Sequence, residues 1–458
     1  MFEIDFTKPC HIHMIGIGGI SMSGLAEILL DSGFRVSGSD RSQSALTMKL
    51  MEEGADIMIG QEAGNITEDI DCAVYTAAIH PGNPEYDECV RRKLPMLTRA
   101  ELLGQIMRNY SHSIAVSGTH GKTTTTSMIT HILFAAHEDP TVSVGGMLPL
   151  IGGNIHIGKD DMFITEACEY TNSFLQFNPT IEVILNVEAD HLDFFRDIDD
   201  IRNSFNLFTG RLPENGAVII NDTIRDYQQI LEGFKGDVIT FGSPEAYVSA
   251  AGIRYDEKAH ASFDLLIDGK EIDRIRLQVP GEHNVQNALA AIAVAIRLGI
   301  DERVFKKGLE TFSGADRRFE VKGKIGEITF LDDYAHHPQE IEATLKAASH
   351  YQHDRIVCVF QPHTYTRTKA LLGDFAKALR LADLVVLADI YAARETNVSG
   401  VSSQDIADLI TADGGNALFL PTFDDIETYL LQELRAGDLC ITMGAGDIVK
   451  VGERMLGN

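Results

Sequence analysis

The sequence predicts an α/β protein of three domains: a Rossmann-like domain at 1–110, a central P-loop ATPase-type domain with a mostly parallel sheet at 111–316, and a second Rossmann-like domain at 317–458. Short apolar runs alternate with segments of helical period in each block, which is typical of parallel α/β sheets. A glycine-rich turn follows the first apolar run of the first two blocks. The length of 458 residues suggests about three domains at roughly 150 residues each.

The composition excludes several classes of protein. The chain carries 67 acidic and 39 basic residues, a formal charge of −28, so we expect no general nucleic-acid or anionic-membrane binding. The six cysteines form no C-x-x-C pair, which indicates free thiols of a reducing compartment. The N-terminus has no apolar signal segment, and an apolar run such as 288–296 is too short to span a bilayer. We therefore expect a soluble, cytoplasmic protein.

The first block opens with the apolar run 11–15, a glycine turn and a segment of helical period. The turn contains Gly16, Gly18, Gly19 and Ser21, and Ser21 stands where the dinucleotide-binding pattern has its third glycine. Asp40 ends the second strand, about where an acid would bind a ribose diol. We interpret this block as a nucleotide or diphosphate cradle. The alternatives are an NAD(P) site, and hence an oxidoreductase, or a tight turn without a ligand.

The strongest signal is a glycine loop between a strand at 114–116 and a helix. It comprises Gly118, Thr119, His120, Gly121, Lys122, Thr123 and Thr124. In such a loop backbone N–H groups approach phosphate oxygens, Lys122 can reach the β- and γ-phosphates of ATP, and Thr123 can bind Mg²⁺. Gly118 stands only three positions before Gly121, whereas the usual pattern has four residues between the two glycines. Either the pattern begins at Ala115 in place of its first glycine, or this loop is a shortened variant of the pattern. A structural turn and a P-loop regulatory switch are the alternatives.

Two strand ends of the second block offer metal ligands. Glu166 and Glu169 end one strand, and His191 follows another. Parallel strands bring their carboxyl ends to one edge of the sheet, which is also the edge of the phosphate loop. We therefore predict Glu169 as a metal ligand and His191 as the ligand of a second metal site. A solvated acid and an ordinary histidine are the alternatives.

Helix starts carry the remaining candidates of the second block. His283, Asn284 and Asn287 lie at the predicted start of a helix. Asn284 and Asn287 are three residues apart and so share one face of it. Their amides can donate and accept together, as an adenine edge requires, or they can cap the helix. Before this helix, 247–280 alternates in polarity and suggests a small antiparallel addition.

The third block gathers histidine, arginine and tyrosine at strand ends. Arg318 precedes the first strand, Asp333 and His336 follow it, and Arg367 lies just after the next one. Ligands of open α/β sheets bind at such strand ends, and an arginine there suits a carboxylate-bearing substrate. Helix capping and surface charge are the alternative. We expect helices over 338–349 and 367–381.

Seven stretches, taken in order, resemble the Mur ligases, which are ATP-dependent amide-forming enzymes of peptidoglycan assembly. They are GIGGISMSG, GTHGKTTTT, NVEADHLDFF, GEHNVQNALAA, RRFE, DDYAHHP and FQPHTYTRT, and they cover nearly the whole chain. The resemblance implies that the first domain binds the UDP-sugar, the second binds ATP and metal, and the third closes over both and admits the amino acid.

The resemblance also assigns residues. It implies that the first glycine loop binds the UDP-sugar and that the loop containing Lys122 and Thr123 binds ATP. For the nucleotide, the resemblance also implies His283, Asn284, Asn287, Arg318 and Asp333. For two Mg²⁺ ions it implies Glu169 and His191 together with Thr123. For the amino acid it implies His336 and Arg367. Two positions depart from the family pattern: Thr364 stands where an arginine is usual, and Cys168 replaces an acid. No lysine lies between Lys159 and Lys235, so the carbamylated lysine of some sister ligases is absent.

The implied reaction joins L-alanine to the carboxylate of UDP-N-acetylmuramate through an acyl phosphate, with release of ADP and phosphate. The partners are therefore these two substrates, without nucleic acid or membrane, and a monomer or homodimer is expected. The rival within the family attaches a tripeptide to the same UDP-sugar, and the stretch 362–368 favours the alanine-adding reaction.

Overall fold

The computed structural model describes residues 2–191, 194–393 and 395–457. These residues form two compact units. The first unit comprises 2–190, 194–241 and 290–305, and the second comprises 191, 242–289 and 306–457 without 394. The chain is mixed α/β with three sheet-containing domains, and the strands of each sheet lie within one of the expected domain ranges. No helix among the described residues is long and apolar enough to cross a membrane.

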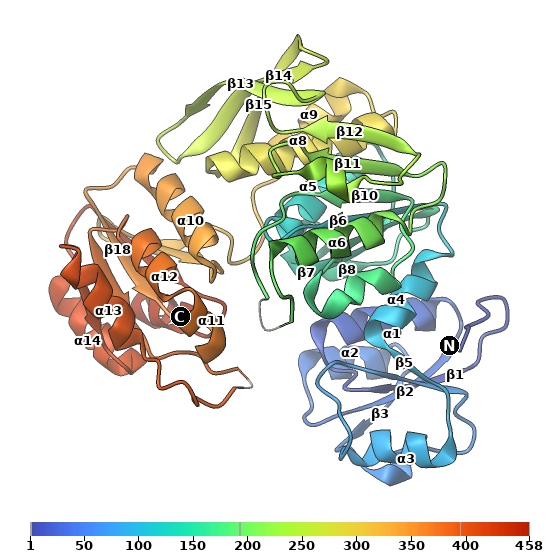
Figure 1. Cartoon of the computed structure of the whole chain (residues 1–458). Helices are drawn as coiled ribbons and strands as arrows, with labels where there is room; N and C mark the ends of the chain where they lie inside the picture. Colours follow the sequence, from blue (N-terminus) through green and yellow to red (C-terminus); the bar gives the residue numbers. More distant parts are fainter. Residues whose placement is uncertain (1, 192–193, 394, 458) are drawn as a thin grey trace. The chain divides into compact units, whose positions relative to one another are not determined.

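The first sheet has the order β3-β2-β1-β4-β5 with all strands parallel (Figure 1). Its strands are β1 (His11–Ile15), β2 (Arg35–Asp40), β3 (Asp56–Ile59), β4 (Cys72–Tyr75) and β5 (Met96–Thr98). The connecting helices are α1 (Ile20–Asp31), α2 (Ala45–Glu52), η1 (Ala63–Asn65), α3 (Pro84–Arg92) and α4 (Arg99–Met107). Side chains of β1 alternate between faces: Ile12 packs in one core with α1 and α2, and Ile15 in another with α3.

The first unit also contains strands β12-β11-β10-β6-β9-β7-β8, parallel except for β8. Their bounds are β6 (His112–Ser117), β7 (Thr141–Leu148), β8 (Gly153–His156), β9 (Met162–Ala167), β10 (Ile181–Ile184), β11 (Ala217–Asn221) and β12 (Asp237–Phe241). The helices are α5 (Lys122–Ala135), η2 (Pro149–Ile151), η3 (Tyr170–Gln176), α6 (Ile198–Thr209) and α7 (Tyr227–Ile230). One continuous core joins both sheets of this unit, because Leu103 of α4 and Phe174 of η3 belong to the same cluster.

In the second unit, the antiparallel strands β13 (Val248–Tyr255), β14 (His260–Ile267) and β15 (Lys270–Pro280) confirm the addition expected near 247–280. Helices α8 (Glu282–Arg297) and α9 (Glu302–Thr311) follow, and both pass from one compact unit into the other.

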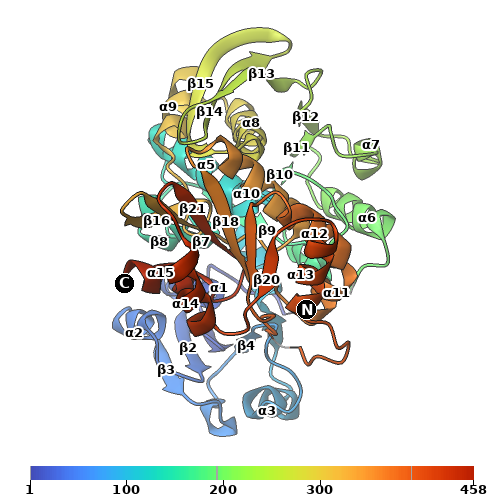
Figure 2. The same cartoon turned by 90° about the vertical axis from the view of Figure 1, so that its left-hand side faces the viewer.

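The third sheet has the order β16-β17-β21-β18-β19-β20, with β16 antiparallel to β17. Its strands are β16 (Glu320–Ile325), β17 (Ile328–Asp333), β18 (Arg355–Phe360), β19 (Leu384–Leu387), β20 (Ala417–Phe419) and β21 (Asp438–Met443). Its helices are α10 (Pro338–His350), α11 (Tyr365–Ala370), α12 (Leu372–Leu379), α13 (Ser403–Ala412), α14 (Phe423–Glu433) and α15 (Val449–Leu456). Helices α10, α12 and α13 pack on one face, and α14 and α15 on the other (Figure 2).

The single helix expected over 367–381 was wrong. Leu371 leaves the helical conformation, with φ of −113° and ψ of 22°, and so separates α11 from α12. This break allows both Leu371 and Leu372 to pack against the core of the third sheet.

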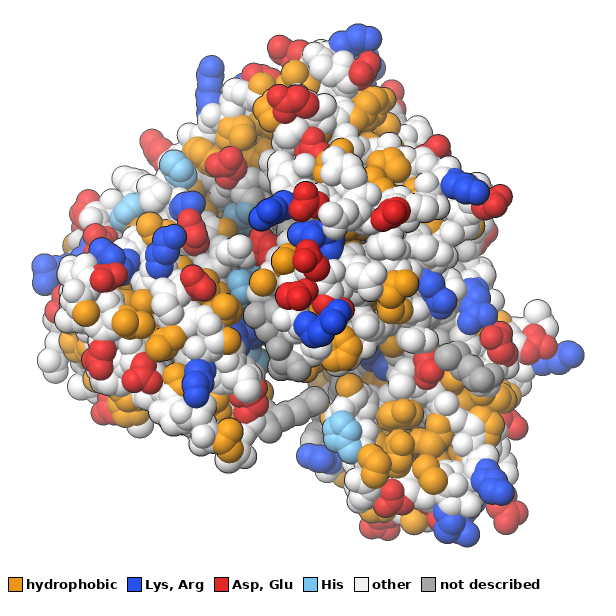
Figure 3. Space-filling view, in the orientation of Figure 1, with side chains coloured by type: hydrophobic (Ala, Val, Ile, Leu, Met, Phe, Trp, Pro, Cys, Tyr) orange, Lys and Arg blue, Asp and Glu red, His pale blue; other side chains and the backbone are white. Residues whose placement is uncertain are grey.

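Charged side chains of both signs are interspersed on the face drawn in Figure 3. Among the described residues drawn there, no broad basic area gathers, which agrees with a formal charge of −28.

Candidate functional site

The first glycine loop is held by β2. The N–H groups of Gly16 and Ile17 donate to the carbonyl oxygen of Ser39 at 2.8 and 3.0 Å. Gly18 N donates to Oδ2 of Asp40 at 2.9 Å, and a Cβ on Gly18 would lie 2.8 Å from that oxygen. The predicted ribose-binding acid is thus engaged with the loop itself, and a side chain at position 18 would have to displace the side chain of Asp40 or Thr47.

The loop ends at the N-terminus of α1, where Gly19 is the N-cap and no side chain caps the helix. Ser21, in the first turn, accepts a hydrogen bond at its Oγ from Nη1 of Arg99 at 3.0 Å. Arg99 is not among the sequence-predicted site residues. Its signal is its position directly after β5, because strand ends of a parallel sheet share an edge with the glycine loop.

The second glycine loop connects β6 to α5 as predicted. Gly118 and Gly121 have φ of 133° and 83°, a region that favours glycine. Asn186, after β10, fastens the loop from the neighbouring strand. Its Oδ1 accepts from His120 N at 2.8 Å, and its Nδ2 donates to His120 O at 3.1 Å. Sequence reasoning assigned no role to Asn186, although it begins the NVEADH motif.

Lys122 and Glu169 lie together at the start of α5. The Nζ of Lys122 is 3.4 Å from Oε2 of Glu169, and it donates to the carbonyl oxygens of Gly118 and Thr119. Burial alone would lower the pKa of Lys122, but Glu169, with smaller contributions from Cys168 and Glu166, raises it above its ordinary value. Lys122 therefore stays charged at neutral pH, as a phosphate ligand must.

Two of the three predicted metal ligands lie in the first compact unit. Thr123 is buried in the first turn of α5, and Glu169 is 2% exposed beside Lys122 in the same compact unit. A hydroxyl and a carboxylate are oxygen donors of the kind that Mg²⁺ prefers. His191 belongs to the second unit, is half-buried and has a φ of 54°. His120, which was predicted for ATP, lies with its Nε2 3.1 Å from Oε2 of Glu188.

The asparagines at the start of α8 are buried and bonded to each other. Asn284 Nδ2 donates to the carbonyl oxygen of Pro280 at 2.8 Å, and its Oδ1 accepts from Asn287 Nδ2 at 2.9 Å. Asn284 therefore links the start of the helix to the preceding chain, as expected if these asparagines cap the helix. The side chain of His283 is instead exposed.

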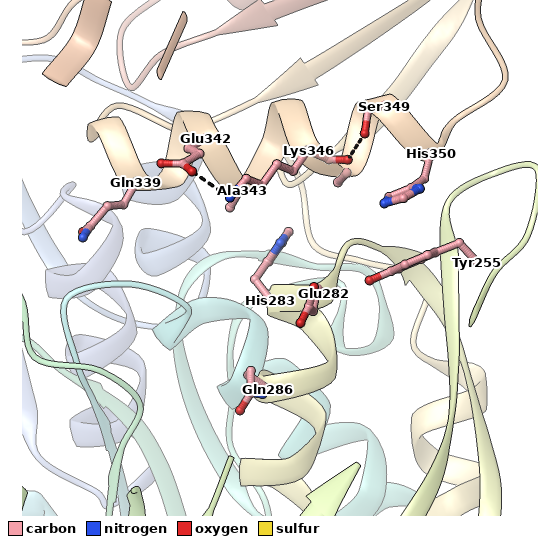
Figure 4. A pocket seen from close by; sticks show the side chains of 11 residues that line it. Tyr255, Glu282, His283, Gln286, Gln339, Glu342, Ala343, Lys346, Ser349 and His350 are labelled. Atoms are coloured by element: carbon pink, nitrogen blue, oxygen red, sulfur yellow. Dashed lines mark hydrogen bonds and ion pairs between the residues drawn. The ribbon is translucent and has the colours of Figure 1, made fainter. Parts of the chain in front are cut away.

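A cavity of about 370 Å³ lies beside His283 in the second unit (Figure 4). Its walls come from α8, α10 and the end of β13. Tyr255 and His350 stack at one end, with ring centroids 4.2 Å apart and planes at 12°. Glu282 and Gln286 of α8 line the cavity opposite the polar face of α10. Planar side chains and amides of this kind suit a flat, polar ring.

Asp333 holds the chain at the end of β17. Its Oδ2 accepts from Phe319 N at 2.9 Å and its Oδ1 from Ala335 N at 2.7 Å. Burial raises the pKa of Asp333 to about 6, against the opposing charge of Arg318. The Cζ atom of Arg318 lies 5.3 Å from the ring centroid of Tyr334. The structure thus brings Arg318 and Asp333 into one local arrangement.

His336 and Arg367 are brought together through His363. The rings of His336 and His363 are 5.8 Å apart at their centroids, and Arg367 Nη1 lies 3.4 Å from Nδ1 of His363. Tyr391 stacks on His363 at 5.6 Å. Burial lowers the pKa of His336 to about 4, so its ring is neutral at pH 7. His363 and Tyr391 were not predicted as site residues, although His363 lies within the FQPHTYTRT motif.

Thr364 adopts a conformation that is rare for its type. Its φ is 67° and its ψ 144°, and β-branched residues seldom occur at positive φ. The turn is fixed by Thr364 N, which donates to the carbonyl oxygen of Tyr391 at 2.9 Å. The residue that departs from the family pattern therefore orients the turn between His363 and Arg367.

Comparisons with known proteins cover the whole chain. Three family models match: "Mur ligase family, catalytic domain" at 11–111, "Mur ligase middle domain" at 116–295 and "Mur ligase, glutamate ligase domain" at 317–446. A UDP-N-acetylmuramate–L-alanine ligase of Lachnospira eligens is 58% identical over 458 residues, 100% of both chains. The crystal structure of the UDP-N-acetylmuramate–alanine ligase of Thermotoga maritima is similar with a TM-score of 0.81 at 30% identity, covering 98% of each chain. A murein peptide ligase of Psychrobacter arcticus has a TM-score of 0.71 at 25% identity, with 98% of each chain covered.

Proposed function

Because the chain belongs to the Mur ligase family, we propose that it joins L-alanine to the carboxylate of UDP-N-acetylmuramate, with conversion of ATP to ADP and phosphate. The observation that carries this proposal is the 58% identity over the full length of an L-alanine-adding ligase. The product of this reaction is a precursor of peptidoglycan. We further propose the domain roles given by the ranges 1–110 for the UDP-sugar, 111–316 for ATP and metal, and 317–458 for the amino acid.

The first chemical step needs positive charge where two anions meet. The substrate carboxylate attacks the γ-phosphorus of ATP, the bond to the β-phosphate oxygen breaks, and ADP leaves with an acyl phosphate formed. Lys122, held charged beside Glu169, is placed to bind the phosphates of ATP. The N–H groups of the loop at 118–121, fastened by Asn186, are fixed before ATP binds, so they orient the phosphates without further ordering.

Thr123 and Glu169 would hold Mg²⁺, and we propose His191 as the ligand of a second ion. When bound, such ions offset the charge repulsion between carboxylate and phosphate. The buried oxygen of Glu169 fits this role, because a buried carboxylate needs cations around it.

The second step needs a free amine close to the acyl carbon. The amine of L-alanine attacks, phosphate leaves, and an amide forms. We propose that Arg367 binds the carboxylate of L-alanine, because a guanidinium can grip a carboxylate with two hydrogen bonds. We place His336 in the same amino-acid pocket, because its ring neighbours His363, which Arg367 contacts.

The other candidate functions receive less support. The murein peptide ligase named above has the lower TM-score and identity of the two solved structures. The three family models that match are those of ligase domains, which favours a ligase over an NAD(P)-dependent oxidoreductase. We also propose that the protein acts as a monomer or homodimer in the cytoplasm.

The test measures phosphate release from ATP in the presence of Mg²⁺ and UDP-N-acetylmuramate, with one amine at a time: L-alanine, glycine, L-serine or the L-alanyl-γ-D-glutamyl-diamino-acid tripeptide. Release that requires both the UDP-sugar and L-alanine supports the proposal. Release only with the tripeptide assigns the chain to the peptide-adding reaction, and no release with any amine overturns the ligase function.

A further inference from the structure

A row of polar side chains crosses one face of the first sheet, and its central members are buried. His11 and His13 of β1 lie on this face, because side chains alternate along a strand. Both rings contact the hydroxyl of Ser37 on β2: His11 Nε2 lies 2.8 Å from its Oγ, and His13 Nδ1 lies 2.9 Å from it. At the two ends, His11 Nδ1 lies 3.2 Å from Oδ2 of Asp69, and His13 Nε2 lies 3.7 Å from Oε2 of Glu85. We call these five residues the histidine relay.

Both ends of the relay are carboxylates without a proton. The hydroxyl of Thr67 lowers the pKa of Asp69 to about 2. Burial alone would raise the pKa of Glu85, but the donors around its carboxylate, of which His13 is the first, lower it below its ordinary value. Each outer ring nitrogen, Nδ1 of His11 and Nε2 of His13, therefore faces an acceptor and needs a proton of its own.

The two inner ring nitrogens compete for one hydroxyl. Nε2 of His11 and Nδ1 of His13 both lie within hydrogen-bond distance of Oγ of Ser37. The hydroxyl has one proton, so it donates to one ring and must accept a proton from the other. The relay has four contacts that need four protons, whereas two neutral rings and one hydroxyl supply only three. The ring that donates to Ser37 therefore carries protons on both nitrogens and is an imidazolium.

The other titratable groups around the two rings do not supply this proton. They are Cys89 of α3, Tyr75 of β4, Asp71 before β4 and Arg35 of β2. Burial raises the pKa of Cys89 to about 11 and also raises that of Tyr75, so both keep their own protons at neutral pH. Asp71 accepts the N–H of His11 at 2.8 Å, and Arg35 is paired with Asp69. The extra proton therefore belongs to the histidines.

Glu85 links the relay to the first glycine loop. Its Oε2 accepts from Oγ of Ser39 at 2.5 Å, and its Oε1 accepts from Nδ2 of Asn65 at 2.5 Å. The carbonyl oxygen of Ser39 in turn accepts the N–H of Gly16, and Asn65 also donates to the carbonyl oxygen of Gly60 at 3.0 Å. A shift of Glu85 would therefore move both the end of β2, which holds the loop, and the turn after β3.

We propose that His11 and His13 share one extra proton, and that this buried charge keeps the carboxyl ends of the first sheet in the form that binds the UDP-sugar. This inference rests on the proposed function for the identity of the ligand. Without the extra proton, one of the four contacts joins two acceptors, which is unfavourable for buried groups. Loss of the proton as pH rises therefore loosens Glu85 and weakens binding. Glu85 and the two histidines are positioning residues, because they act through Ser39.

The test measures equilibrium binding of UDP-N-acetylmuramate by titration calorimetry at pH 6, 7 and 8. The carboxylate and the diphosphate of this ligand stay ionised over that range, so a change in affinity reports on the protein. We expect the dissociation constant of the unchanged protein to rise about 3- to 10-fold from pH 6 to pH 8. Binding at pH 8 should also take up protons, to a limit of about one per ligand, which is measured by repeating the titration in buffers with different heats of ionisation.

Glu85→Gln should remove both effects. Its amide can donate to Nε2 of His13, so that two neutral rings satisfy the relay. The dissociation constant should then change less than about 2-fold between pH 6 and pH 8, without proton uptake. If Glu85→Gln does not fold, Ser37→Ala serves as the test with the same expected result, because it removes the shared hydroxyl and with it the need for a second proton on either ring.

The matched control is His112→Gln. His112 is the exposed first residue of β6 in the same compact unit, so its loss should leave the pH dependence and the proton uptake unchanged. A Glu85→Gln protein with undiminished proton uptake would overturn the proposal. An affinity of the unchanged protein that stays constant from pH 6 to pH 8 would overturn the link between the proton and binding.

The proposed function fails separately, if the unchanged protein does not bind UDP-N-acetylmuramate at any of these pH values. The shared proton is then judged from the ring nitrogens of ¹⁵N-histidine-labelled protein at pH 7, because imidazolium and neutral rings give different spectra. An imidazolium signal that disappears in Glu85→Gln supports the relay, and identical ring spectra of the two proteins overturn it.

Discussion

The backbone of Gly104 lies directly against the carbonyl oxygen of Gln176, so that a Cβ on Gly104 would be 1.9 Å from that oxygen. Gly104 is in α4, which packs on the first sheet. Gln176 is the last residue of η3, which follows strand β9 of the central sheet. Asn178 reinforces the contact, because its Nδ2 donates to the carbonyl oxygen of Gly104 at 3.0 Å. This close approach joins the two sheets of the first unit.

Gly104→Ala should therefore destabilise the first unit. Helix propensity alone would favour alanine by about 1 kcal/mol, whereas the steric overlap should cost about 1–3 kcal/mol or more. The measurement is the midpoint of urea unfolding. Gly373→Ala in α12 is the control, because a Cβ there meets nothing within 4 Å, and it should unfold at the same or a higher midpoint. A stabilised Gly104→Ala protein would contradict the packing argument.

Lys122→Ala should lower kcat/KM about 1000-fold or more, because it removes a main positive charge from the phosphates in the transition state. Steady-state phosphate release measures this loss. Lys159→Ala is the control, since Lys159 is exposed and should show unchanged kinetics. Near-normal turnover of Lys122→Ala would show that the loop does not bind the reacting phosphates.

Arg367→Ala should raise the KM for L-alanine about 10- to 100-fold and leave the KM for ATP unchanged, because one charge-assisted contact to a carboxylate is lost. Initial rates at varied L-alanine and ATP test this. The control is Lys369→Ala, an exposed position of the same helix α11. A change in the KM for ATP alone would place the amino-acid pocket elsewhere.

Glu182, at the centre of β10, should make the protein less stable as pH rises. It is 0% exposed, its Oε2 accepts from Thr209 at 2.9 Å, and burial raises its pKa to about 8 from 4.5. Between these two values the unfolded chain has lost the proton that the folded chain keeps, so the unfolding free energy falls as pH rises through this window.

Glu182→Gln should remove this dependence, because glutamine has no proton to lose. Its unfolding free energy should exceed that of the unchanged protein at pH 8 by a few kcal/mol, with the difference shrinking towards pH 5. Urea unfolding at pH 5, 6.5 and 8 measures it. A difference that stays constant with pH would contradict a protonated Glu182.

The phosphate loop and the helix that follows it could be predicted because their signals are local. The glycines at 118 and 121 need only their own backbone freedom, and α5 follows from apolar spacing. The strands β7 and β8 could not be predicted in this way. Gly145 and Gly146 interrupt the apolar pattern of β7, and that strand forms because Glu166 of the neighbouring strand accepts the N–H of Gly145 and because β9 pairs with it.

The residues of the candidate site also fall into those with a local sequence signal and those without one. Lys122, Glu169 and Arg367 could be named as candidates from the sequence, because each lies at or shortly after the end of a strand in a motif with its own chemical signature. Arg99, Asn186 and His363 could not be assigned in the same way, because their significance lies in what they contact: Ser21, His120 and Arg367.

By itself, the sequence determined the alternation of strands and helices, the two glycine loops and the family to which the chain belongs, because these depend on residue type and spacing along the chain. The tertiary structure alone decided which charges are paired. Lys122 is matched by Glu169, and Asp40 by a loop N–H group, whereas Arg99 forms no ion pair among the described residues and donates to the hydroxyl of Ser21. Whether a buried charge is compensated depends on distances of a few ångströms between strands that are far apart in the chain, and residue spacing does not encode those distances.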